Sequence, residues 1–356
     1  MAKSMLKTVL SDQLTRKPYL TFQLSKNIHQ VARLSNLTNE QIRLRRSKLF
    51  EDEKKKQLNR IPRLEKIEVK YVGSPEEAVM IMNKNISSPF NVAQHMSEML
   101  CDRSALALVN GQIWDMHRPL EEDCTVELLH FHTDDPFQVN RAFWRSCSFL
   151  LGAAVERSFR DDLLVQQHSF PPPNVASGSF VADIDLGLQH DWEPSREEMM
   201  VFSAQMHRMA ERKLPFQRLT VDAKFAEEMF EENQYKLSQL PSIAGSSGDG
   251  HSVTLYKVGD HVDISAGPMV GDSSFLGRRC TVPVAHKIAH NDMKVYRYGS
   301  LVTVGNILLP LMYFRFQGVA LPKDVYLNHY AFNVLEKRAS RLNMAGLQTT
   351  KVPKPV

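Results

Sequence analysis

Several features that define common protein classes are missing from this sequence of 356 residues. Its four cysteines include no Cys-x-x-Cys pair, which argues against a disulfide framework or a zinc ribbon and favours a reducing compartment. No apolar run reaches the roughly 18 residues that span a bilayer. The nearest candidate, residues 298–314, contains Asn306 and Pro310, so we expect a buried strand and turn there. A hydrophobic content of 43% also excludes general disorder.

The net charge is only +4, but basic and acidic side chains are unevenly distributed along the chain. Residues 1–35 hold six basic side chains and one acidic one, residues 36–66 hold ten and five, and the tail from Glu336 holds five and one. Residues 67–335 therefore carry a net charge of −10. We expect the basic ends to contact RNA and the acidic body to contact proteins.

The first 35 residues are basic, contain many hydroxyl groups and hold a single acid. This composition is typical of a mitochondrial targeting leader. The spacing of Leu6, Val9, Leu10 and Leu14 allows a short amphipathic helix. A disordered basic tail is the alternative interpretation.

Residues 36–65 predict a basic helical arm, which begins with the capping-box spacing of Thr38 and Gln41. Helical arms of this kind can lie along RNA phosphates. A charge run is also typical of a solvated helix face, and residues 51–53 are acidic. The candidate RNA-binding residues are Arg43, Arg45, Arg46, Lys54, Lys55, Lys56, Arg60 and Arg63.

Residues 66–132 predict a small β-grasp module made of a strand, a helix, a hairpin and a closing strand. The helix begins at Ser88-Pro89 and continues to about Leu100, and Asn110-Gly111 supplies a two-residue hairpin turn. The segments Leu108-Val-Asn-Gly-Gln and Pro119-Leu-Glu-Glu-Asp-Cys-Thr-Val-Glu-Leu-Leu resemble the TGS domain of threonyl-tRNA synthetase.

The resemblance continues in the same order through residues 137–300, where a helix around residues 143–157 resembles the first helix of the synthetase's editing domain. It implies an α+β fold: a TGS-like β-grasp module, then a threonyl/alanyl-tRNA synthetase editing-like α+β domain, with helical N- and C-terminal extensions. Residues 301–356 predict a strand, a helix from Lys323 to Leu342 and a basic tail. The matching segments are Ser177–Asp185, Pro194–Glu198, Arg212–Phe216, Val253–Asp263, Ser265–Met269 and Tyr296–Gly299.

The family's editing site uses His-x-x-x-His on this helix and Cys-x-x-x-His on a later turn. The resemblance maps these four positions onto Arg145, Phe149, Ser265 and Met269. Arg145 stays protonated and Phe149 has no donor or acceptor, while Ser265 lacks a thiolate and Met269 is no zinc ligand. We therefore expect no hydrolysis, no metal and no cofactor. Arg145 either projects into the cleft, where a phosphate or an acidic group can bind it, or lies beside core residues at the surface.

Other patterns are less specific. His286 and His290 have helical i, i+4 spacing but no cysteine beside them, and His130 and His132 end a strand. The glycines of residues 244–250 lack the lysine of a phosphate-binding loop. None of these patterns predicts a catalytic site.

Only 58 residues follow Tyr298, too few for an aminoacylation domain. The combination of segments resembles the threonyl-tRNA-synthetase-like family of mitochondrial large-subunit ribosomal proteins. This resemblance implies a structural role in the mitochondrial matrix, with mitochondrial large-subunit ribosomal RNA and neighbouring ribosomal proteins as partners. The same resemblance implies neither a membrane nor a small-molecule substrate among the partners. The alternatives are a free-standing mitochondrial tRNA-editing hydrolase and a tRNA-binding factor.

Overall fold

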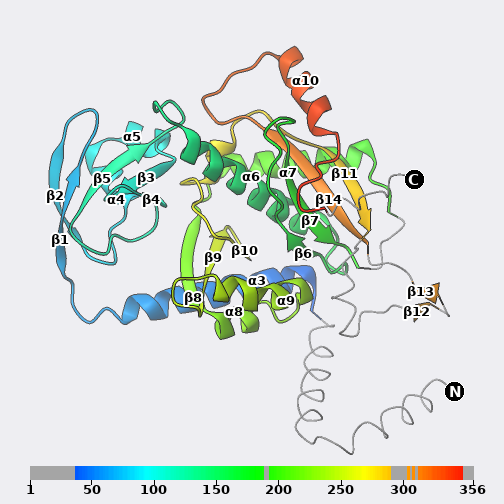
Figure 1. Cartoon of the computed structure of the whole chain (residues 1–356), viewed down its shortest axis with the longest axis horizontal. Helices are drawn as coiled ribbons and strands as arrows, with labels where there is room; N and C mark the ends of the chain where they lie inside the picture. Colours follow the sequence, from blue (N-terminus) through cyan, green and yellow to red (C-terminus); the bar gives the residue numbers. More distant parts are fainter. Residues whose placement is uncertain (1–36, 188–191, 290–302, 305–306, 309–311, 348–356) are drawn as a thin grey trace, which may run out of the picture.

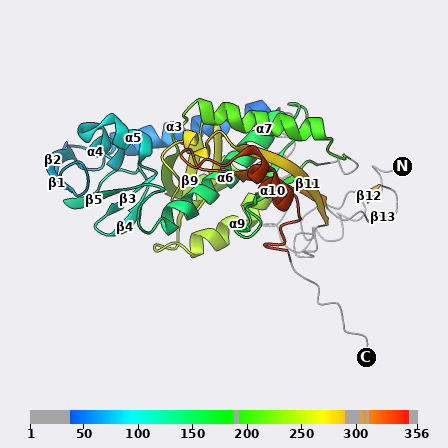
Figure 2. The same ribbon diagram turned by 90° about the horizontal axis from the view of Figure 1, so that it is seen from above.

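The computed structural model describes residues 37–187, 192–289, 303–304, 307–308 and 312–347. Figure 1 shows strands β1 to β5 and two short helices at one end of the molecule, with the other elements gathered beyond them. Figure 2 shows the same arrangement from above. Among the described residues, no helix is long and apolar enough to cross a membrane. The expected leader, the end of the tail and most of the strand and turn expected at 298–314 lie outside the described residues.

The first sheet has the strand order β2–β1–β5–β3–β4. Its internal strand β1 alternates exposed and buried residues, as a strand with one face on a core should. Asn110 and Gly111 have φ angles of 50° and 76°, so the hairpin predicted there is confirmed. The strands are β1 (Lys66–Tyr71), β2 (Ala78–Asn83), β3 (Leu106–Val109), β4 (Gln112–Trp114) and β5 (Cys124–Leu129).

Two helices, α4 (Pro89–Met96) and α5 (Glu98–Arg103), pack on this sheet. The prediction of a single helix from Ser88 to about Leu100 is therefore wrong. Ser97 has an extended backbone, and its hydroxyl accepts a hydrogen bond from the backbone N–H of Leu100 at 3.3 Å. A serine can cap a new helix in this way because its side chain replaces a missing backbone acceptor.

A second sheet has the order β11–β14–β7–β6 and separates two layers of helices. Alternation along β14 puts Phe314 and Phe316 in the main core with α6 and α7, whereas Val319 packs against Phe332 of α10 on the opposite face. The elements are α6 (Phe137–Ser158), β6 (Gln166–Ser169), β7 (Phe180–Asp185), α7 (Arg196–Glu211), the 3₁₀ turn η1 (Ser273–Leu276), β11 (Cys280–Ala289), β14 (Met312–Ala320) and α10 (His329–Ala339).

A three-stranded sheet of order β10–β9–β8 carries three helices, and one of them is the predicted basic arm. That helix, α3, contributes the fully buried Phe50 to a core shared with the sheet, and Figure 1 shows it lying along β8 and α8. Thr38 and Gln41 form the predicted capping box. The elements are α3 (Asn39–Asn59), β8 (Gln217–Asp222), α8 (Ala223–Met229), α9 (Gln234–Gly245), β9 (Ser252–Val258) and β10 (His261–Ile264), and β12 (Thr303–Val304) pairs separately with β13 (Ile307–Leu308).

Three further expectations about secondary structure need correction. Helix α6 begins at Phe137, before the predicted segment. Helix α10 begins at His329 rather than Lys323, because the side chain of Asn328 caps it by accepting from the Ala331 N–H at 2.7 Å. His286 lies in strand β11, so helical spacing does not bring it to His290, which is outside the described residues.

Candidate functional site

The four positions that correspond to the editing motif lie where helix α6 meets the turn after β10. The Nη1 of Arg145 donates to the carbonyl of Pro268 at 2.9 Å, and the hydroxyl of Ser146 lies 3.5 Å from the sulfur of Met269. The turn approaches closely because Gly267 has a φ of 64° and a Cβ there would lie 1.9 Å from the hydroxyl of Tyr256. The fold therefore brings helix α6 and the turn after β10 together, as the resemblance implies.

Two of the four positions are part of the apolar interior. Phe149 and Met269 are each 1% exposed and belong to the same hydrophobic core. The ring of Phe149 stacks on Phe170 with centroids 5.9 Å apart and meets the edge of His261 at 4.9 Å. A close-packed interior leaves no space for an attacking water at these positions.

The other two positions, Arg145 and Ser265, line a groove of about 710 Å³. Burial and then the charge of Arg141 lower the pKa of Arg145, and the Nζ of Lys236 in the same groove pairs with Asp263 at 2.6 Å. Within the described ranges, no group of three or more His, Cys, Asp or Glu side chains could hold a metal. The groove therefore presents hydroxyl groups and cations rather than an acid–base pair.

Asp115 connects the first sheet to this degenerate site, and the sequence pattern alone did not single it out as functional. Its carboxylate lies 2.9 Å from the hydroxyl of Tyr256 and accepts from the backbone N–H of Met269 at 2.8 Å. Burial raises the pKa of Asp115, although these two hydrogen bonds oppose the effect. The contact fixes the β4 end of the first sheet against the turn that holds position 269.

The first half of α3 is held to the body by ion pairs. Arg46 is 4% exposed and contacts Glu156 at 3.1 Å and Glu232 through its Nε at 2.6 Å. Arg45 also pairs with Glu232, and Arg43 lies 3.6 Å from Asp260. Carboxylates of the body therefore neutralise these three cations, of which Arg45 is still partly exposed, and this weakens the case for their contact with RNA phosphates.

The end of α3 and the turn after it carry exposed cations. Lys55, Arg60 and Arg63 are exposed and have no carboxylate partner among the described residues. Lys56 is exposed but pairs with Glu53 at 3.4 Å, and Lys54 donates to the side chain of Gln217 at 2.6 Å. The predicted RNA-binding set thus divides into a group paired with carboxylates of the body and an exposed group.

The paired group extends to a histidine that no pattern in the sequence singled out. His261 is 2% exposed, and its Nδ1 lies 2.6 Å from Glu156. Burial acts to raise the pKa of Glu156, but His261, Arg46 and Arg43 outweigh it and lower that pKa to about 2. Because the partners are more than 100 residues apart in the chain, no local motif could have identified them.

Comparisons with known proteins agree with this geometry. A family model described as the TGS domain matches residues 71–130. The probable threonine–tRNA ligase 1 of Dictyostelium discoideum is 32% identical over 206 residues, which cover 58% of this chain and 27% of that enzyme. The cytoplasmic threonine–tRNA ligase 2 of Bos taurus is 32% identical over 52% of this chain and 23% of its own length. The chain therefore spans about a quarter of these enzymes.

The large ribosomal subunit protein mL39 of Drosophila melanogaster matches much more of the chain. It is 49% identical over 304 residues, which cover 85% of each protein. An identity of this level across nearly the whole length, together with the TGS match, means that this chain belongs to the family of the large ribosomal subunit protein mL39.

Proposed function

We propose that the chain is a structural component of the mitochondrial large ribosomal subunit, where it contacts ribosomal RNA and neighbouring ribosomal proteins. The observation that carries this proposal is the 49% identity to a large ribosomal subunit protein over 85% of both chains. In this role, the chain uses a TGS-like domain, residues 66–132, and an editing-like domain, residues 137–300. The hydrogen bonds of Asp115 with Tyr256 and Met269 link the two domains. The function is structural rather than enzymatic.

The degenerate editing positions support a role without catalysis. Phe149 and Met269 fill the interior, and Arg145 and Ser265 provide neither a general base nor a metal ligand. Hydrolysis of an ester bond needs a positioned base or an activated water, and these four side chains supply neither. What remains is a folded scaffold whose surface is available for binding.

The exposed cations at the end of α3, namely Lys55, Arg60 and Arg63, are the candidates for contact with ribosomal RNA in this region. When exposed cations neutralise RNA phosphates, the counterions condensed on the RNA are released, which makes binding favourable and salt-dependent. The acidic residues of the body favour contact with neighbouring proteins rather than extended RNA coating. Because Arg43, Arg45 and Arg46 are paired internally, the proposal no longer includes them.

Sedimentation tests the proposal directly. The tagged full chain in mitochondrial lysate should sediment with intact large ribosomal subunits and stay with them through a second gradient. A chain that remains at the top of a gradient containing intact subunits would contradict the proposal. A parallel assay on seryl-tRNA separates the alternative, since turnover that falls when Arg145 or Ser265 is replaced would indicate an editing hydrolase.

A further inference from the structure

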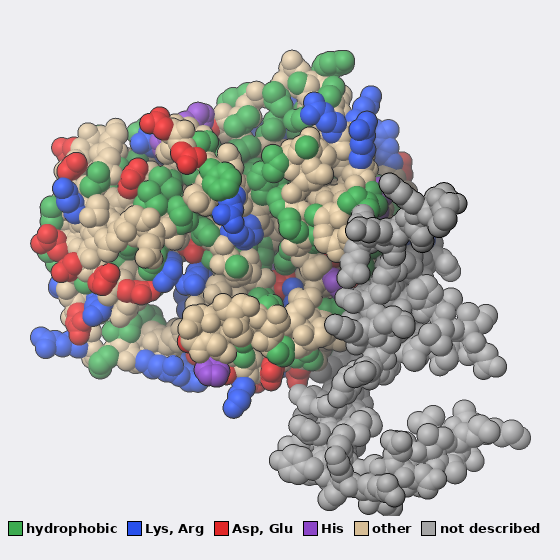
Figure 3. All heavy atoms as spheres, in the orientation of Figure 1, with side chains coloured by type: hydrophobic (Ala, Val, Ile, Leu, Met, Phe, Trp, Pro, Cys, Tyr) green, Lys and Arg blue, Asp and Glu red, His purple; other side chains and the backbone are tan. Residues whose placement is uncertain are grey.

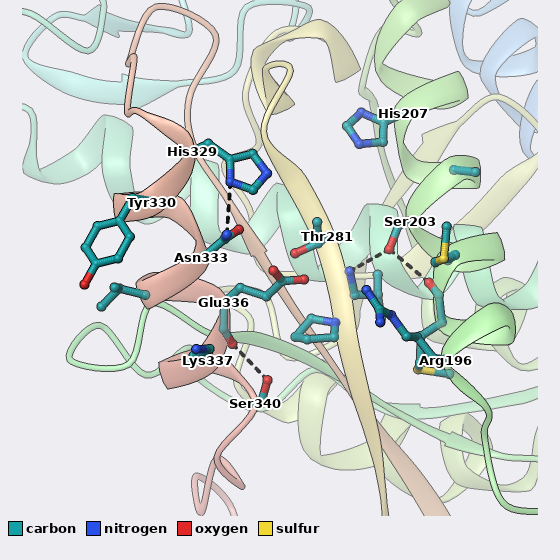
Figure 4. Close-up of a pocket in the computed structure, with 16 residues that line it drawn as sticks. Arg196, Ser203, His207, Thr281, His329, Tyr330, Asn333, Glu336, Lys337 and Ser340 are labelled. Atoms are coloured by element: carbon teal, nitrogen blue, oxygen red, sulfur yellow. Dashed lines mark hydrogen bonds between the residues drawn. The ribbon is translucent and has the colours of Figure 1, made fainter.

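A long groove runs between helix α7 and the segment that leads into and forms α10. Its first half has a volume of about 920 Å³ and lies between α7, the start of β11 and α10 (Figure 4). Its second half, about 900 Å³, lies between the end of α7, the loop after η1 and residues 323–327. His207 lines both halves, so they form one continuous surface.

The groove is positively charged. It is lined by three acids, Glu211, Asp324 and Glu336, against twice as many cations. Only one of these cations, Lys213, has a carboxylate within 4 Å among the described residues, and that pair with Asp102 is itself exposed. The six cations are Arg196, Lys213, Arg278, Arg279, Lys323 and Lys337.

This surface contrasts with the first half of α3, where carboxylates neutralise each arginine that the sequence suggested for RNA binding. Beyond the groove, α10 and the residues after it expose Arg338 and Arg341. Figure 3 shows Lys and Arg side chains gathered over this part of the molecule. Unpaired cations that flank a groove produce a field that attracts a polyanion.

Each half of the groove also carries one exposed aromatic side chain. Tyr326 is 85% exposed and lines the second half, and Tyr330 is 79% exposed and lines the first. In Figure 4, Tyr330 projects outward from α10, on the side away from Thr281 and Arg196, so it lies at the outer rim of the groove rather than between its walls. Large aromatic side chains usually bury most of their surface, so two rings in solvent beside unpaired cations offer flat apolar faces to a partner.

We infer that the α7–α10 groove binds an unpaired segment of RNA, with its phosphates along the cations and bases stacked on Tyr326 and Tyr330. Single-stranded nucleic acids bind proteins through this combination of a cationic groove and aromatic platforms. A duplex would offer phosphates but keep its bases stacked on each other, so no base would be available to stack on the tyrosines. The inference rests on the proposed function, since it assigns a surface for the RNA contact of the same protein.

The test measures binding of the full chain to an oligouridine of about twelve nucleotides and to a hairpin RNA by fluorescence anisotropy. The double variant Tyr326→Ala/Tyr330→Ala should bind oligouridine at least about tenfold more weakly, because each lost stacking contact removes a sizeable part of the affinity. Tyr326→Phe/Tyr330→Phe should keep nearly full affinity, since phenylalanine retains the stacking face. Both tyrosines are exposed, so these changes leave the core intact.

A charge variant tests the second component. Arg278→Gln/Lys323→Gln should reduce the slope of log affinity against log salt by roughly 1.4, or about 0.7 per lost phosphate contact on a single strand. The matched control Lys70→Gln/Lys84→Gln removes the same charge from the first sheet, where both lysines pair with surface glutamates. The control should leave the slope unchanged.

Several outcomes overturn the inference. These are no oligouridine binding by the unaltered chain, equal affinity in the tyrosine-to-alanine variant, or equal effects of the two charge variants. Stronger binding to the hairpin than to oligouridine would also overturn it. If the tyrosine-to-alanine variant leaves the ribosomal subunit while its RNA affinity is unchanged, the groove docks a protein and the inference is wrong. Failure of the proposed function is separate, because it appears as loss of cosedimentation in the unaltered chain whatever its RNA affinity.

Discussion

The hydroxyl of Tyr256 lies 2.9 Å from both carboxylate oxygens of Asp115, although the two residues are 141 positions apart. Asp115 follows strand β4 of the first sheet, and Tyr256 lies in β9. Both side chains are almost completely buried. The hydrogen bonds therefore join the first sheet to β9, next to the turn whose position 269 corresponds to a residue of the family's editing motif.

Removing this contact should weaken the protein measurably. Tyr256→Phe deletes the hydroxyl and leaves the buried carboxylate of Asp115 with one fewer donor, so we expect a loss of about 1–3 kcal/mol in the free energy of unfolding. Urea denaturation measures the change. Tyr330→Phe is the matched control, since that hydroxyl is exposed and its loss should change stability by less than about 0.5 kcal/mol. Equal effects would show that the buried contact contributes little.

The pair of Glu156 and His261 predicts a dependence of stability on pH. The pKa of Glu156 is lowered to about 2 in the folded protein, so its ionised form is favoured by folding. Its contribution is fully present above the ordinary carboxyl pKa of about 4.5 and is lost as the pH falls toward 2. The loss should be on the order of 3 kcal/mol.

Denaturation at pH 7, pH 4 and pH 3 measures this effect. Glu156→Gln should lower stability at pH 7 and flatten the decline between pH 4 and pH 3, because the titrating carboxyl is gone. A variant that declines as steeply as the unaltered chain would show that other carboxyls cause the acid sensitivity.

Substitution of two cations of α3 should affect different properties: the stability of the fold in one case and binding to the ribosomal subunit in the other. Arg46→Ala removes the buried cation that lies between Glu156 and Glu232, so we expect a loss of about 3–5 kcal/mol in unfolding free energy. Lys55→Ala removes an exposed charge and should change stability by less than about 0.5 kcal/mol, while it weakens binding to large ribosomal subunits in a salt-dependent manner. Thermal unfolding and cosedimentation at two salt concentrations separate the effects. Loss of subunit binding by a fully folded Arg46→Ala protein would restore that arginine to the RNA-binding set.

The aromatic side chain at the former editing position should be needed for folding. Phe149→Ala opens a cavity beside Phe170 and Phe216 and should cost about 3–5 kcal/mol. Phe137 on the same helix is 57% exposed, so Phe137→Ala provides a control with the same chemical change and an effect below about 1 kcal/mol. Calorimetry compares the two, and equal melting temperatures would show that Phe149 does not fill the pocket.

Local signals in the sequence predicted much of this structure. The capping box of Thr38 and the hairpin at Asn110-Gly111 are confirmed because residues within four positions of each other determine them. The break at Ser97 was missed because the apolar pattern continues through it and the serine hydroxyl decides the outcome. Patterns over short windows do not reveal such competition between a cap and a continuous helix.

The candidate site was harder to predict because its partners are distant in the chain. The arginines of α3 looked available for phosphates, and only the fold brings Glu156 and Glu232 to them. Conversely, Tyr326 and Tyr330 fit a helical apolar stripe in the sequence, but both are exposed. The helix starts only after Asn328, and Phe332 is the aromatic side chain that it buries. Burial of individual side chains depends on neighbours that periodicity does not specify.

The ion pairs of α3 also have a consequence for synthesis of the chain. A ribosome makes a protein from its N-terminus, so α3 leaves the exit tunnel before its carboxylate partners, which lie 110 and 186 residues downstream of Arg46. Until β8 and α8 have been made, Phe50 lacks its core partners, and Arg45 and Arg46 still lack Glu232. Attachment of α3 is therefore a late event, because Asp260, which lies 3.6 Å from Arg43, is made later still.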